Sequence, residues 1–357
     1  MFTRSHSFLF LTCAALVPLL TLASTPASYN ITPEQISTYQ RDGVIVIRGL
    51  LEGRELKDAI KAANRVQRSK GLGQRLLYKL SPSYRNLEFQ TWRKHRALEK
   101  VAFDSAAPTI CAKLMGLENT NDGEGSGATA GDFRPLRLLK DAVLGYSAGD
   151  KGCGWHVDDR VFWPCEDKNI GKRDAGVNVW ITLSPVSAKE GGGLAIAPGS
   201  HRVGFAKKAR EAIAAMGPAT TCFLQKLAPE CHEKMERLKV VHDLEAGDAI
   251  IHDRYVFHRA EPFVDPIKGK KSGTKQRVSL RYVPADATFV DNKMNVDRVI
   301  KQKGLSTGDP ISKGGEYFPQ TWPNRLPEEK RSKVIADQNP FTLNKILKMI
   351  IMQKKKE

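Results

Sequence analysis

The spacing of apolar and polar residues predicts helices in the first third of the chain. Residues 32–43 begin with threonine and proline, carry glutamine three positions after the threonine and end at a glycine, which is the pattern of a capped helix. The β-branched run at 44–47 then predicts a short strand. Apolar residues recur every three or four positions in 52–69 and again in 95–116, which predicts two further helices.

The pattern changes after residue 133. Short runs rich in β-branched and aromatic residues now alternate with Gly, Pro and Asp turns, as in antiparallel sheets. A polar, glycine-rich loop at 117–133 precedes them, and a helix-prone insert interrupts them at 203–238. The sequence therefore predicts a mainly β fold, a barrel or jelly roll, with helices packed from the N-terminal side. The predicted strand runs are 136–149, 176–186, 192–201, 239–253 and 276–285.

Residues 1–27 have the pattern of a signal peptide. Arg4 precedes an apolar run from Phe8 to Ala23, small residues follow the run, and no acidic residue occurs. The run is shorter than the about 20 residues that a membrane-spanning helix needs. We therefore expect cleavage and a location in the secretory pathway, in the ER lumen or outside the cell. An uncleaved membrane anchor and a plastid transit peptide are the alternatives.

Residues 326–357 form a basic tail. Leu343, Ile346, Leu347 and Ile350 recur at helical spacing with lysines beside them, which is typical of an amphipathic helix at a membrane surface. An apolar stripe of this kind also packs on a neighbouring domain, and we expect it to dock in that way. Peripheral contact with an anionic membrane is the alternative.

Composition narrows the function classes. With 41% hydrophobic and 27% charged residues, the chain is globular rather than disordered or fibrous. Its net charge of +17 favours anionic partners, but most basic residues are scattered and no aromatic-interleaved basic motif occurs. The absence of a Cys-x-x-Cys pair argues against a thiolate zinc site. We expect a monomer that binds a small molecule and no nucleic acid.

The run GWHVDDRVFWP at 154–164 holds the candidate chemistry. Side chains two positions apart on a strand share a face, so we expect His156 and Asp158 to point together and Asp159 to point away. With a second histidine from a distant strand, this pair makes the two-histidine, one-carboxylate triad that holds non-haem Fe(II). The pair alone is a weak indicator, because such residues also recur by chance in caps and cores.

Further motifs follow in a fixed order. A Gly-Asp turn leads into a strand that ends in His258, and the next strand carries RVSLRY. With YQRDGVIVIRGLL, GWHVDD and VNVWITLSPVSAKEGGGLAIAPGSHR, these pieces span roughly residues 32–285. In this order they resemble the phytanoyl-CoA dioxygenase family of Fe(II)- and 2-oxoglutarate-dependent oxygenases.

The resemblance implies a double-stranded β-helix, a jelly roll with the metal at one mouth. It also implies that His156, Asp158 and His258 hold Fe(II) and are the catalytic residues. His252 and His242 compete for the third ligand position, and the family's spacing from the Gly-Asp turn favours His258.

The implied activity is hydroxylation of a small, lipophilic or anionic metabolite by an oxygenase domain at 28–325. Fe(II), 2-oxoglutarate and O2 take part, and succinate and CO2 are released. Relatives that halogenate have a small residue at the carboxylate position, so Asp158 favours hydroxylation. Trp155, Phe162 and Trp163 suggest an apolar wall beside the ligands.

The far carboxylate of 2-oxoglutarate needs a cation that offers two donors in one plane, which is the geometry of arginine. The resemblance favours Arg277 for this contact, with Ser279 beside it. Lys275 and Arg281 lie on the same face of the predicted strand, and they are the alternatives.

Trp180 and Tyr146 are expected to line the co-substrate pocket, or else to belong to the core. Many relatives have serine where this chain has Ala260, which removes one co-substrate contact of the family. Two other functions use the same residues: a ligand-binding protein without catalysis and a zinc hydrolase. An intact triad beside a basic strand favours the oxygenase, because zinc hydrolysis does not require Arg277.

Overall fold

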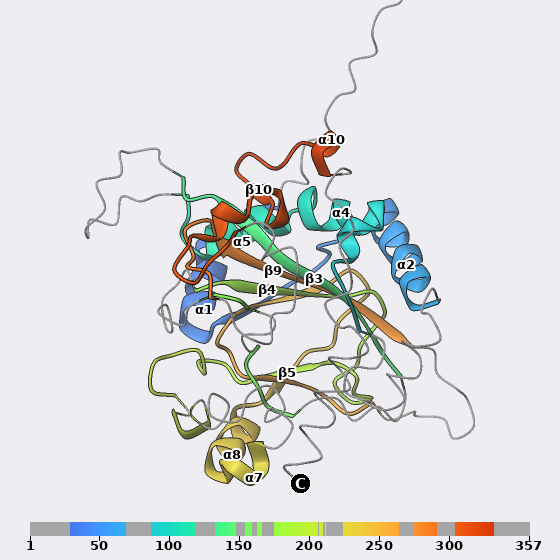
Figure 1. Cartoon of the computed structure of the whole chain (residues 1–357). Helices are drawn as coiled ribbons and strands as arrows, with labels where there is room; N and C mark the ends of the chain where they lie inside the picture. Colours follow the sequence, from blue (N-terminus) through green and yellow to red (C-terminus); the bar gives the residue numbers. More distant parts are fainter. Residues whose placement is uncertain are drawn as a thin grey trace, which may run out of the picture.

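A computed structural model shows how the predicted elements assemble (Figure 1). The presequence 1–27 and the helical part of the tail lie outside the residues that it describes. The described residues are 29–68, 87–118, 133–147, 154–158, 163–165, 175–205, 207–209, 211, 224–263, 274–290 and 304–331.

Two antiparallel sheets form the centre of the described structure. The larger sheet has the strand order β1-β7-β4-β9-β3-β10, with β2 also paired to β3, and the smaller sheet has the order β6-β5-β8. Figure 1 shows the larger sheet above the smaller one, which contains β5. The strands are β1 Val44–Ile47, β2 Leu87–Phe89, β3 Leu136–Tyr146, β4 Val177–Thr182, β5 Leu194–Ile196, β6 Val240–Val241, β7 Ala249–Asp253, β8 His258–Ala260, β9 Lys275–Pro284 and β10 Gln320–Trp322.

The predicted capped helix is confirmed as α1, Pro33–Asp42. The Thr32 hydroxyl accepts a hydrogen bond from the Gln35 amide at 3.2 Å, and the Gln35 side chain accepts one from the Thr32 amide at 2.9 Å. Gly43 ends the helix with a φ of 70°, a left-handed conformation that glycine adopts without steric cost.

The helix predicted at 95–116 is instead two helices, α4 Arg96–Phe103 and α5 Ala107–Leu114. Pro108 explains the break, because proline has no amide hydrogen to donate to the carbonyl of Asp104, four residues earlier. The predicted helix at 52–69 is present as α2, Gly53–Arg68. The insert contains α7 Leu224–Leu227 and α8 Pro229–Leu238, and the short helical elements are η2 Thr91–Arg93, η4 Ile311–Tyr317 and α10 Glu328–Arg331.

The larger sheet separates the main apolar core from an inner face that also carries polar residues. On β4, Val177, Val179 and Ile181 belong to the main core with residues of α2, α4 and α5. The alternate residues of a strand face the other way, so Asn178 and Trp180 face the smaller sheet. The register continues this inner face across the strands, because Asn178 lies opposite His252 of β7 and Arg281 of β9. The helices thus cover the outer face and leave the inner face for a site.

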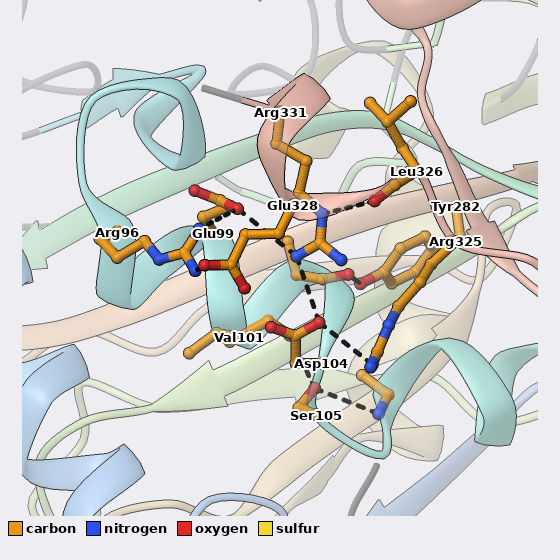
Figure 2. A network of polar contacts seen from close by, with 12 residues as sticks. Arg96, Glu99, Val101, Asp104, Ser105, Tyr282, Arg325, Leu326, Glu328 and Arg331 are labelled. Carbon is orange, nitrogen blue, oxygen red and sulfur yellow. Dashed lines mark hydrogen bonds and ion pairs between the residues drawn. The ribbon is translucent and has the colours of Figure 1, made fainter. Parts of the chain in front are cut away.

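The C-terminal segment is fastened to α4 by a buried arginine (Figure 2). Arg331 is 3% exposed, and its Nη1 lies 3.4 Å from Glu99 and 3.2 Å from Asp104. Arg325 also contacts Asp104, at 3.1 Å, and Arg96 pairs with both Glu99 and Glu328. The chain therefore remains packed on α4 beyond the expected domain end at residue 325. Among the described residues, no helix combines the length and hydropathy that a membrane crossing requires.

Asp141 is a buried carboxyl group on the outer face of β3. It accepts hydrogen bonds from the Thr91 hydroxyl and from the Trp92 amide. Burial raises its pKa from an ordinary 3.8 to about 6, and these hydrogen bonds offset only part of that rise. Because the pKa is raised in the folded state, ionisation of this carboxyl destabilises the fold as the pH increases from about 4 to 6.

We predict that Asp141→Asn removes this pH-dependent loss, because the amide stays neutral and its oxygen still accepts hydrogen bonds. Denaturant unfolding of both proteins between pH 4 and 7 would measure the effect. The free energy of unfolding of the wild type should fall relative to the variant by roughly 2 kcal/mol over that range. Parallel curves for the two proteins would contradict the prediction.

Candidate metal centre

Two histidines meet where the segment at 154–158 runs beside β8. The backbones of His156 and His258 exchange hydrogen bonds of 3.0 and 2.9 Å, and their ring centroids lie 4.4 Å apart. The Nδ1 atom of His156 lies 2.7 Å from the Gly154 carbonyl, and that of His258 lies 3.1 Å from the Val256 carbonyl. A carbonyl only accepts, so each Nδ1 carries the proton and each Nε2 presents a lone pair.

Asp158 completes a group of three ligands. The expected ligand atoms of His156, Asp158 and His258 all lie within 4.8 Å of one another. Within this group, Asp158 Oδ1 is 3.7 Å from His258 Nε2. The structure thus brings together the three residues that the sequence pattern selected. Asp159 and Phe162 lie outside the described residues.

The other carboxylate oxygen of Asp158 is held by donors from three parts of the chain. Its Oδ2 accepts from Arg281 Nε at 2.9 Å, from Asn178 Nδ2 at 3.1 Å and from Trp163 Nε1 at 3.2 Å. Asn178 is oriented in turn by Ser279, whose hydroxyl donates to its amide oxygen at 2.8 Å. Asp158 therefore presents Oδ1 to the histidines while its other oxygen is occupied.

The protonation states of these groups suit a metal ion. Burial alone would raise the pKa of Asp158, but the Arg281 cation and then the neighbouring histidines hold that pKa well below its usual range. Burial and the other histidines hold the pKa of His258 well below its usual value. At neutral pH the carboxylate is ionised and the His258 imidazole is neutral, which are the forms that bind metals.

A further histidine lies beside this group. The ring centroid of His252 is 4.6 Å from that of His258, and its Nδ1 lies 2.9 Å from the Asp253 carbonyl. Burial lowers its pKa to about 4, so it is neutral at physiological pH. Among the described residues its buried Nε2 has no hydrogen-bond partner. His252 is nevertheless not part of the three-residue ligand group, and neither is His242, which follows β6.

The three cations expected on one face of β9 have different surroundings. Arg281 pairs with Asp158, and Lys275 lies toward the rim, 3.7 Å from the half-exposed Glu190. Arg277 is buried between two aromatic rings, 4.8 Å from the Tyr146 centroid and 5.1 Å from that of Trp180. This enclosure favours Arg277 as the anchor for a buried carboxylate, and that role stays a prediction.

Two tryptophans expected on one apolar wall lie in different places. Trp163 donates to Asp158 and packs in a cluster with Cys165, Phe289 and Phe318. Trp155 is fully buried in a cluster with residues of the insert. Successive side chains of an extended segment point to opposite sides, so Trp155 points away from the side that His156 faces. The expectation of a wall formed by Trp155 is therefore wrong.

Sequence reasoning also missed two polar residues of the site. Asn178 is a polar residue at an inward position of an otherwise apolar strand, and this pattern could have marked it. Glu236 of α8 has no comparable sequence signal. It accepts from Trp155 Nε1 at 2.7 Å and lies 3.2 Å from Arg259 Nη2, and thus links the neighbours of both histidine ligands.

The comparisons with known proteins agree with this arrangement. The family model described as Phytanoyl-CoA dioxygenase (PhyH) matches residues 39–264. The crystal structure of the non-haem alpha ketoglutarate dependent carbocyclase SnoK from nogalamycin biosynthesis has a TM-score of 0.56 at 21% identity, covering 82% of this chain and 97% of SnoK. No curated protein sequence matches the chain.

A second similar structure is the epimerase SnoN, also from nogalamycin biosynthesis and alpha ketoglutarate dependent. Its TM-score is 0.52 at 17% identity, with 83% of this chain and 97% of SnoN covered. SnoN in complex with Fe3+, alpha ketoglutarate and nogalamycin RO gives 0.50 at 18% identity, with 81% and 97% covered. Likenesses at this identity concern the fold, and they confirm the predicted jelly roll.

We predict that Glu236→Ala lowers the stability of the protein by about 1–2 kcal/mol, because it removes charge-assisted contacts to Trp155 and Arg259 that are only partly exposed. The melting temperature should fall by a few degrees. Glu233→Ala is the matched control, since Glu233 lies on the same helix and its side chain is 71% exposed. Equal melting temperatures for the two variants would show that Glu236 does not stabilise this region.

Proposed function

Because the chain belongs to the phytanoyl-CoA dioxygenase family, we propose that it is an Fe(II)- and 2-oxoglutarate-dependent dioxygenase that hydroxylates a small metabolite. The buried group of His156, Asp158 and His258 carries this proposal, because two histidines and one carboxylate are the ligand set of non-haem Fe(II) oxygenases. The Fe3+ and alpha ketoglutarate bound in SnoN support the same pair of cofactors.

The residues of the site fit these cofactors. His156 Nε2, His258 Nε2 and Asp158 Oδ1 would hold the iron, and their hydrogen bonds fix which atoms are offered. Bound iron and 2-oxoglutarate supply an oxidative decarboxylation that yields succinate and CO2 and is coupled to hydroxylation of the substrate. The protein contributes binding, orientation and the exclusion of water.

Arg277 would bind the far carboxylate of 2-oxoglutarate. Its planar guanidinium offers two parallel donors, and the rings of Tyr146 and Trp180 keep it in place and away from water. Low solvent exposure strengthens a charge pair of this kind. The Ser279 hydroxyl is bonded to the Asn178 amide, so we assign Ser279 to orienting Asn178 toward Asp158.

Hydroxylation is the reaction that we favour over the carbocyclisation and epimerisation named for SnoK and SnoN, whose likeness concerns the fold. The presence of Asp158 supports hydroxylation over halogenation. The substrate we propose is a small lipophilic or anionic metabolite.

We also propose that the chain enters the secretory pathway. This proposal rests on the signal-peptide pattern of residues 1–27, and the N-terminal sequence of the protein isolated from its cells would test it. We also propose that the tail helix docks on the domain, which likewise rests on the sequence pattern alone. Membrane contact is the alternative.

The direct test of the function uses the purified protein with Fe(II), 2-oxoglutarate and O2. We expect succinate to form even without the true substrate, because uncoupled turnover consumes the co-substrate, and we expect Asp158→Ala to abolish it. Calorimetric titration of 2-oxoglutarate into the Fe(II)-loaded protein gives a second measurement. No binding in that titration would contradict the proposal.

The role of Arg277 gives a sharper prediction. Arg277→Ala should raise the dissociation constant of 2-oxoglutarate more than tenfold, because a buried charge pair of about 2–5 kcal/mol is lost. Fe(II) affinity should change little, since the metal ligands are untouched. Lys275→Ala removes a cation from the same strand face and should leave the constant within about twofold. A normal constant for Arg277→Ala would move the anchor elsewhere.

A further inference from the structure

The two oxygens of Asp158 have unequal surroundings. Oδ2 accepts three hydrogen bonds, at 2.9, 3.1 and 3.2 Å, whereas Oδ1 is the oxygen that lies 3.7 Å from His258 Nε2. A carboxylate offers about four lone-pair sites in total, about two on each oxygen, so three donors more than occupy those of one oxygen. The group is thus divided into an occupied oxygen and an oxygen that faces the histidines.

The donors themselves are fixed in place. Asn178 is 3% exposed, and the Ser279 hydroxyl at 2.8 Å from its amide oxygen turns the NH2 side toward Asp158. Trp163 is fully buried, and the Arg254 guanidinium lies 5.4 Å from its ring centroid. Arg281 is 6% exposed on β9, directly opposite Asn178 in the sheet register. Burial and these contacts hold the three donors on the Oδ2 side of the carboxylate.

The Arg281 contact also differs from a simple ion pair. An arginine that serves only to neutralise a carboxylate commonly grips both oxygens with its two-pronged fork. Here the bond runs from Nε to Oδ2, on the same oxygen that Asn178 and Trp163 contact. The pairing neutralises the charge of Asp158 and still leaves Oδ1 for a metal.

We propose that Arg281, Asn178 and Trp163 are positioning residues that restrict Asp158 to binding the metal through Oδ1 alone. This inference rests on the proposed function. Carboxylates bind metals through one oxygen or two, and the choice changes the number of positions left open. One carboxylate oxygen and two histidines leave three positions of a six-coordinate ion, enough for a chelating keto acid and O2. A two-oxygen carboxylate would leave only two.

The number of water ligands on a bound metal tests the proposal without any turnover. The probe is Mn(II) alone, loaded into the full-length protein without 2-oxoglutarate, and the waters are counted from the broadening of its EPR signal in 17O-enriched water. We expect three waters in the wild type and two in the Arg281→Met, Asn178→Leu double variant, in which Oδ2 is released to the metal. Lys275→Met, a control on the same strand face, should keep three.

Two waters in the wild type, or three in the folded double variant, would overturn the proposal. A wild-type count of two overturns the proposal even where the double variant does not fold, and the single variants Arg281→Met and Asn178→Leu then replace the double variant. Failure of the proposed function has a different signature, because Mn(II) would then not bind, or 2-oxoglutarate would displace no water from it.

Discussion

A carboxylate is buried at low cost only where other groups stabilise its charge, and most of this site is arranged around that requirement for Asp158. The side chain is 5% exposed. Its stabilising donors come from β4, from β9 and from the segment at 163–165, which are far apart in the sequence. The sheet register places Asn178 opposite Arg281, so one buried charge links the strand order to the candidate chemistry.

The same fold carries different reactions, and the site rather than the fold has to account for the difference. SnoK and SnoN are a carbocyclase and an epimerase with similar architecture. In this chain the features that bear on the reaction are local: a carboxylate with one oxygen occupied, a neutral His252 next to the ligand group, and an arginine between two rings. These features bear on how the metal's open positions are used.

Sequence patterns predicted well what depends on short spacing. The Thr32 cap, the strand runs and the shared face of His156 and Asp158 follow from periods that a few residues reveal. The partners of Asp158 depend on which strands become neighbours and in which register, and local spacing does not contain that information. Pro108 marks a possible helix break in the sequence. The apolar period continues on both sides of it, so periodicity alone predicted one helix where there are two.

The fastening of the C-terminal segment has a consequence for biosynthesis. Trp163 belongs to the same buried cluster as Ile311 and Phe318, and the chain just beyond them is fixed to α4 through Arg331. A ribosome releases this segment after every ligand of the metal centre has already emerged. Part of the support for Asp158 therefore comes from residues 311–331, so the complete site forms only once synthesis has passed residue 331.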